Sequence, residues 1–65
     1  MAAAPPAGGY AVLFMDGAKE SVGRSGLSHA DAMADAEEFQ REGKVARVMH
    51  VVGARSYEVD RYPPR

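Results

Sequence analysis

The sequence predicts a single α+β domain in which one helix lies between two β-hairpins along the chain. A segment with helical periodicity occupies the middle of the sequence, and an apolar run bounded by glycine-containing turn signals lies on each side of it. The most apolar strands are expected in the centre of a four-stranded antiparallel sheet with the order 2-1-3-4, with the helix across one face. The chain of 65 residues suffices for one such domain, formed by residues 10–62.

The helix is the best-defined element and is expected to begin after Ser28 and to end before Gly43. The Ser28 hydroxyl can accept a hydrogen bond from a free N–H group of the first turn, and Gly43 can adopt the left-handed conformation that closes a helix. One apolar face recurs at intervals of three and four residues and comprises Ala32, Met33, Ala36 and Phe39. Because this face is mostly alanine, the helix can lie close to the sheet.

The first hairpin is expected from residues 10–15 and 19–23. The Asp-Gly pair at positions 16 and 17 favours a two-residue type I′ turn, which places Leu13 opposite Glu20. The returning strand is the more polar of the two and therefore suits the edge of a sheet.

Residues 23–26 (GRSG) are expected to form the loop that joins this hairpin to the helix. Glycines before a helix N-terminus are also typical of phosphate-binding loops, and GxxG occurs in the RNA-binding loop of KH domains. A KH loop has helices on both sides, whereas a strand precedes this segment, so we favour a plain connection.

The second hairpin is expected to turn at Gly53-Ala54. Gly-X is typical of a two-residue type II′ turn. That turn pairs Val52 with Arg55, His50 with Tyr57, Val48 with Val59 and Arg47 with Asp60. A three-residue loop is the alternative, and it would instead bring together Met49, Val51, Tyr57 and Val59.

Both ends of the chain are expected to lie outside the domain. Residues 1–9 contain two prolines and two glycines and no polar anchor, so we expect a disordered or loosely draped segment. Consecutive prolines cannot donate hydrogen bonds to a strand, so residues 63–65 are expected to form a tail.

Both central strands are apolar on their two faces, although one helix can cover only one face of a sheet. We therefore expect an exposed apolar face that includes Met49 and Val51, and such a face usually marks an interaction site. A second copy packed sheet to sheet, a larger partner, or the proline-rich N-terminal residues would each cover it. We favour a homodimer or a protein partner.

The charges are divided between the helix and the remainder of the chain. The net charge is −1, but residues 28–43 carry five acidic residues and one arginine, and the remaining residues carry four acidic and seven basic ones. Four of the helical acids form one row at helical spacing: Asp31, Asp35, Glu38 and Glu42. Such asymmetry can steer a charged partner, although a solvated helix face explains it equally well.

The sequence contains no pattern typical of an enzyme, a metal site or a cofactor site. It has no cysteine and only two histidines, His29 and His50, at no metal-binding spacing. No serine lies in a nucleophile motif, so we expect a non-enzymatic protein without a metal or cofactor. We also expect no membrane span, no signal peptide and a cytoplasmic location, from the short apolar runs and the missing cysteines.

The first functional hypothesis is a small protein-binding module that inhibits a larger, nucleic-acid-handling complex. The acidic row would enter a basic groove of the partner, and Met49 and Val51 would contribute apolar contact. In size and hairpin-helix-hairpin layout, the chain resembles small phage-encoded inhibitors of the anti-CRISPR type. The resemblance covers the architecture and includes no shared motif; it implies a protein that occludes a surface of its partner.

The alternative hypothesis is nucleic-acid binding through the basic side of the sheet. Phosphate contacts would come from Lys19, Arg47, Arg55 and Arg61, and Tyr10 or Tyr57 would stack on a base. The net charge of −1 and the acidic helix count against this hypothesis.

Overall fold

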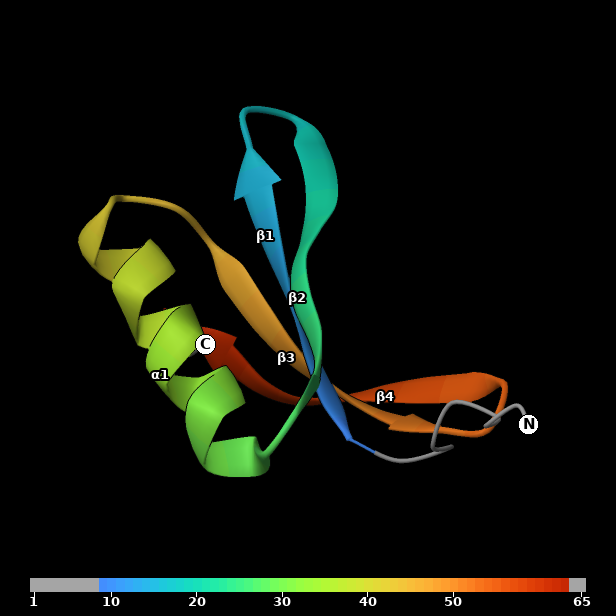
Figure 1. The fold of residues 1–65 in the computed structure, drawn as a ribbon. Coiled ribbons are helices and arrows are strands. Elements are labelled where there is room, and N and C mark those ends of the chain that lie inside the picture. The colour runs from blue at the N-terminus through green and yellow to red at the C-terminus, as the bar shows by residue number, and fades with distance from the viewer. Residues whose placement is uncertain (1–8, 64–65) are drawn as a thin grey trace.

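The computed structural model describes residues 9–63. They form a four-stranded antiparallel sheet with one helix packed across one face (Figure 1). The elements are β1 (Tyr10–Asp16), β2 (Lys19–Leu27), α1 (His29–Arg41), β3 (Ala46–Val52) and β4 (Arg55–Tyr62), and the sheet order is β2-β1-β3-β4. The predicted fold class and strand order are therefore confirmed. The predicted disorder of the N-terminal segment and most of the predicted tail lie outside the described residues.

Both ends of α1 lie where the sequence predicts them. The Ser28 hydroxyl oxygen accepts a hydrogen bond from the Asp31 backbone N–H at 3.1 Å. At the other end Gly43 has a φ of +86°, and the Lys44 N–H donates to the Phe39 carbonyl at 3.0 Å. This bond, with that from the Gly43 N–H to the Gln40 carbonyl at 2.9 Å, forms a Schellman motif.

The core lies between α1 and the face of the sheet that the helix covers. Ala32 and Ala36 of α1 are fully buried, and they cluster with three fully buried strand residues, Val12, Ala46 and Val48. Beside this cluster the Phe39 ring stacks on the Phe14 ring, with centroids 4.5 Å apart. The alanine-rich face predicted from the sequence is therefore the face that packs on the sheet.

The first hairpin turns one residue later than the sequence suggested. Asp16 pairs with Lys19, so Gly17 and Ala18 form the turn, and Leu13 faces Val22 instead of Glu20. Gly17 has a φ of +67°, while no described non-glycine residue has a positive φ. A turn centred on Asp16 and Gly17 would force a positive φ on the aspartate, whereas the observed turn needs it only at glycine.

The prediction of a loop at residues 23–26 is wrong, because β2 continues through these residues to Leu27. The pairing with β1 shifts there: Leu13 pairs with Val22 and Val12 with Arg24, so Gly23 is an extra residue in β2. A Cβ atom at position 23 would lie 3.1 Å from a ring carbon of Phe39. Glycine at this position therefore lets the helix bring its aromatic side chain against the strand.

The second hairpin has the expected two-residue turn, and the three-residue alternative is wrong. Val52 pairs with Arg55 and His50 with Tyr57, as predicted. The register then shifts between Val48 and Met49 of β3, so the predicted partners of Val48 and Arg47 are also wrong. Val48 pairs with Asp60 and Arg47 with Arg61, because Val59 is an extra residue in β4 and is 44% exposed.

Candidate functional site

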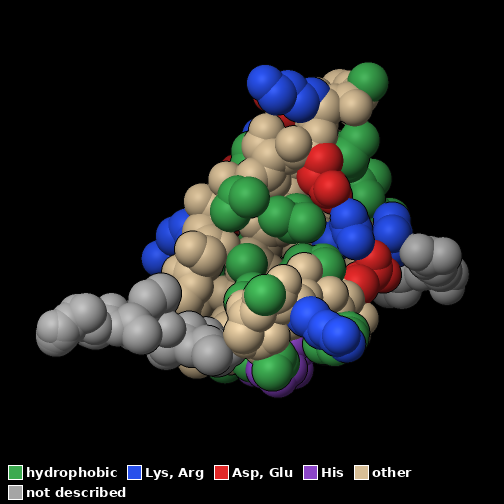
Figure 2. All heavy atoms as spheres, turned by 90° about the vertical axis from the view of Figure 1, so that its right-hand side faces the viewer, with side chains coloured by type: hydrophobic (Ala, Val, Ile, Leu, Met, Phe, Trp, Pro, Cys, Tyr) green, Lys and Arg blue, Asp and Glu red, His purple; other side chains and the backbone are tan. Residues whose placement is uncertain are grey.

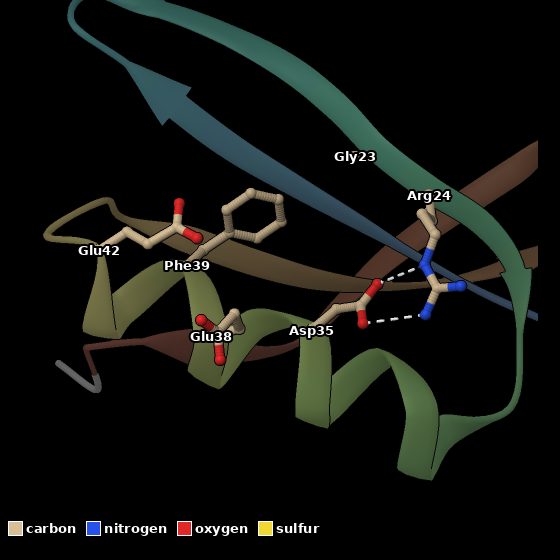
Figure 3. Close-up of a pocket in the computed structure, with 6 residues that line it drawn as sticks. All are labelled: Gly23, Arg24, Asp35, Glu38, Phe39 and Glu42. Atoms are coloured by element: carbon tan, nitrogen blue, oxygen red, sulfur yellow. Dashed lines mark hydrogen bonds and ion pairs between the residues drawn. The ribbon is translucent and has the colours of Figure 1, made fainter.

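A groove of about 290 Å³ lies between α1 and β2. Its lining combines the extra glycine of β2, the following arginine and one side of the helix: Gly23, Arg24, Asp35, Glu38, Phe39 and Glu42 (Figure 3). Three members of the acidic row predicted from the sequence therefore line one groove. The fourth, Asp31, lies in the first turn of the helix outside this lining.

One end of the groove is closed by an ion pair between Arg24 and Asp35. The arginine Nε donates to Asp35 Oδ2 at 2.7 Å, and its Nη2 donates to Oδ1 at 2.9 Å, which is the bidentate geometry of a strong charge-assisted pair (Figure 3). Hydrogen bonding to Arg24 lowers the pKa of Asp35. Asp35 therefore connects the helix to the edge strand and is not a free carboxylate.

The aromatic part of the groove is Phe39. Figure 3 shows its ring directed from the helix toward the strands. The ammonium group of Lys44 lies 5.7 Å from the Phe39 ring centroid and 5.3 Å from that of Phe14, within the usual range of a cation–π interaction. The same ammonium group lies 3.3 Å from Glu42 Oε1. The structure therefore already places a cation beside this aromatic pair and a carboxylate.

The remaining carboxylates of the groove, Glu38 and Glu42, are exposed and each contacts one basic side chain. The Glu38 side chain is 61% exposed and meets Arg41 at 3.1 Å, and the Glu42 side chain is 47% exposed and meets Lys44. Exposed ion pairs of this kind contribute little to stability. The six lining residues carry three carboxylates and one guanidinium, and the cations that pair with Glu38 and Glu42, Arg41 and Lys44, lie outside the lining.

The face of the sheet turned away from α1 is mixed and not uniformly apolar. Figure 2 shows hydrophobic side chains separated by acidic and basic ones. Arg47 of β3 donates to Glu20 of β2 at 2.9 Å and to Glu58 of β4 at 2.8 Å, and Glu58 also accepts from Arg61 at 3.0 Å. We call these four residues the Arg47 network. It joins three of the four strands across the face that the sequence suggested would be apolar.

The two apolar residues predicted to contact a partner lie on this face, away from the acidic groove. Met49 pairs with Ala11, and each is less than 9% exposed, so Met49 offers little surface. Val51 is partly exposed, and the best exposed apolar side chain of this face is Val22, at 63%. The predicted partner-binding residues therefore divide between two surfaces on opposite sides of the sheet.

The residues predicted to bind nucleic acid are also not brought together. Arg47 and Arg61 are engaged with carboxylates, and the hydrogen bonds that Arg47 donates to Glu20 and Glu58 raise its pKa. Lys19 and Arg55 follow the turns of the two hairpins, which lie at opposite ends of the sheet because β1 and β3 are antiparallel (Figure 1). Tyr57 is 51% exposed but pairs with His50, which places it on the helix side of the sheet.

A cluster of aromatic and imidazole rings was not predicted. The Tyr10 ring lies between His50, with centroids 4.5 Å apart, and His29, at 4.8 Å, and His29 Nε2 lies 3.3 Å from Asp60 Oδ2. The sequence suggested only that His50 would lie beside Tyr57. The four residues of the cluster come from β1, α1, β3 and β4, so no local spacing marks it.

The described part of the chain shows no metal centre and no membrane-spanning element. Within residues 9–63, no group of three or more histidine or acidic side chains is arranged to hold a metal ion. Over the same residues, α1 is too short and too polar to cross a bilayer. No protein-family model matches the sequence, and comparisons with curated proteins and with solved structures found no match. The function therefore has to be inferred from the geometry of this chain.

Proposed function

We propose that this protein is a small non-enzymatic module that binds a basic surface of a partner protein through the acidic side of α1. The observation that supports this most directly is the groove between α1 and β2, where the Glu38 and Glu42 carboxylates are exposed and are held only by weak surface ion pairs. The arginines of the opposite face are instead neutralised within the Arg47 network. The Glu38 and Glu42 carboxylates are therefore more accessible to a partner than the charged groups of the Arg47 network.

The partner that best fits this surface is one that handles nucleic acid. A basic groove that normally receives phosphates presents the charge that an acidic helix complements, and complementary charge raises the association rate. Occupying that groove would inhibit the partner, in the way implied by the resemblance of the layout to small inhibitors of the anti-CRISPR type. A homodimer through the open face and a cytoplasmic location remain predictions.

Capture of the partner by charge-reversed variants tests this proposal. The chain would be tagged and used to capture proteins from a lysate of its host, and Glu38→Lys with Glu42→Lys would be compared with the wild type. We expect capture to fall at least about tenfold, because like charges across an interface cost several kcal/mol. Lysine is well tolerated near a helix C-terminus, so the fold should persist, as circular dichroism can confirm.

The matched control reverses two other acids, Asp16→Lys with Glu37→Lys. This double variant has the same net charge, but Asp16 lies at the end of β1, and Glu37 lies on the other side of α1 by the helical period. Capture should stay within about twofold of the wild type, since the groove is intact. Equal loss in both variants would show that only net charge matters, and no loss in either would refute the proposal.

A further inference from the structure

We propose that the groove between α1 and β2 receives one arginine side chain of the partner, placed against Phe39 and bound by Glu38 and Glu42. This inference rests on the proposed function and names the chemical group that the acidic surface recognises. It concerns the described residues of the groove and requires no change in the backbone.

The size of the groove suits a single long side chain. Its volume of about 290 Å³ is just below the range in which pockets for small molecules begin, about 300 Å³. The groove is also preformed, because its two walls are connected at one end by the bidentate Arg24–Asp35 pair. The stacking of Phe39 on Phe14 fixes the aromatic part. The free-energy cost of ordering the site when an occupant binds is therefore small.

The chemistry of the lining favours a cation with an apolar stem. The ammonium group of Lys44 already lies near the Phe14 and Phe39 rings and contacts Glu42, so this surface attracts a cation within the chain itself. A partner's cation would exchange with the exposed pairs of Glu38 and Glu42, each of which is weak. The exposed carboxylates of the lining are complementary to that cation.

Arginine fits this lining better than lysine. A guanidinium group is planar, stacks on aromatic rings and binds a carboxylate through two parallel hydrogen bonds, whereas an ammonium group is a strongly hydrated point charge. The pair of Arg24 with Asp35 shows that bidentate geometry is attainable at the groove. Glycine at position 23 keeps the strand wall free of a side chain that would press on Phe39.

The experiment is an NMR titration of the ¹⁵N-labelled full chain with three blocked pentapeptides in low salt. The probes are acetyl-Gly-Ser-X-Ser-Gly-amide, where X is arginine, lysine or citrulline. We expect the arginine peptide to shift the amide signals of Gly23, Phe39 and Glu42. Its affinity should exceed that of the lysine peptide by about fivefold, and citrulline, which keeps the shape without the charge, should produce no saturable shift.

One double variant and its matched control complete the test. Glu38→Gln with Glu42→Gln should remove the response to arginine, and Asp16→Asn with Glu37→Gln, which has the same change in charge, should preserve it. Shifts that map to the opposite face of the sheet would overturn the inference. The same follows if citrulline binds as well as arginine, or if the glutamine variant binds as well as the wild type.

The outcome also separates this inference from the function on which it rests. If the peptides fail to bind while partner capture still depends on Glu38 and Glu42, the acidic surface contacts the partner but the groove does not receive arginine. If partner capture is insensitive to charge reversal, the proposed function is wrong, whatever the peptides do.

Discussion

The two faces of the sheet carry similar residue types but use them in different ways. On the open face, Arg47 lies between Glu20 and Glu58, so positive and negative groups satisfy each other within the chain. On the helix side, one arginine is paired with Asp35, and the other carboxylates of the groove are themselves exposed, each in a single ion pair. The comparison shows that the composition of a surface does not reveal which charges are available to a partner; the internal pairing decides it.

The largest effect is expected from truncating Phe39, which belongs to both the groove and the packing of the helix. Phe39→Ala should lower the free energy of unfolding by about 2–3 kcal/mol, somewhat less than for a fully buried phenylalanine because the ring is partly exposed. The measurement is urea unfolding followed by circular dichroism. A domain of this size has a total stability of only about 3–5 kcal/mol, so much of the variant would be unfolded.

The matched variant on the open face is Val22→Ala. Val22 is 63% exposed, so we expect a change of less than about 0.5 kcal/mol in the free energy of unfolding. Similar losses in the two variants would show that the open face is packed as tightly as the helix side, and the contrast between the faces would be wrong.

The elements set by local signals were predictable from the sequence. Ser28 and Gly43 define the ends of the helix because capping depends on one residue and its near neighbours. The strand order follows from the apolar content of the two central strands and was predicted correctly. The row of acids was visible because helical spacing alone places its members on one side of α1.

The remaining features depend on contacts between distant positions. Gly23 is required by the approach of Phe39, 16 positions further along the chain, and Arg24 meets Asp35, which is 11 positions further along. Neither contact leaves a local pattern, so β2 appeared to end before it does. The extra residues Gly23 and Val59 also shift the strand register of the two hairpins. A bulge lies within a strand, so the residues of the turn do not predict it.

A smaller effect is expected from acid, and it sharpens the comparison of the two faces. Arg24 lowers the pKa of Asp35, and Arg61, with Arg47, lowers the pKa of Glu58. A carboxyl group with a lowered pKa in the folded state stabilises the fold above its unfolded pKa, which is about 4. That contribution is lost as the pH falls from about 4 through the lowered value, so wild-type stability should decrease there.

The variants Arg24→Gln and Arg47→Gln should respond differently to acid. Arg24→Gln removes the main cause of the Asp35 shift, so the difference in urea midpoint between pH 7 and pH 3 should become smaller than in the wild type, with the part due to Glu58 remaining. Arg47→Gln leaves Arg61 on Glu58, so more of the acid dependence of Glu58 should remain. Urea titrations at the two pH values measure this, and an acid dependence unchanged in Arg24→Gln would contradict the role of the Arg24–Asp35 pair.

The smallest effect is expected on nucleic acid, where we predict no retardation of labelled single-stranded or duplex DNA in a gel-shift assay at about 20 mM salt. Phosphate contacts are strongest at low salt, so binding through the basic side of the sheet would be most visible there. The arginines of the open face are occupied by Glu20 and Glu58, and Lys19 and Arg55 lie at opposite ends of the sheet. If Glu20→Gln retards DNA more than the wild type does, the ion pair with Glu20 prevents Arg47 from binding phosphate. Retardation by the wild type would favour nucleic-acid binding over the protein partner, because the exposed carboxylates of Glu38 and Glu42 should repel phosphate.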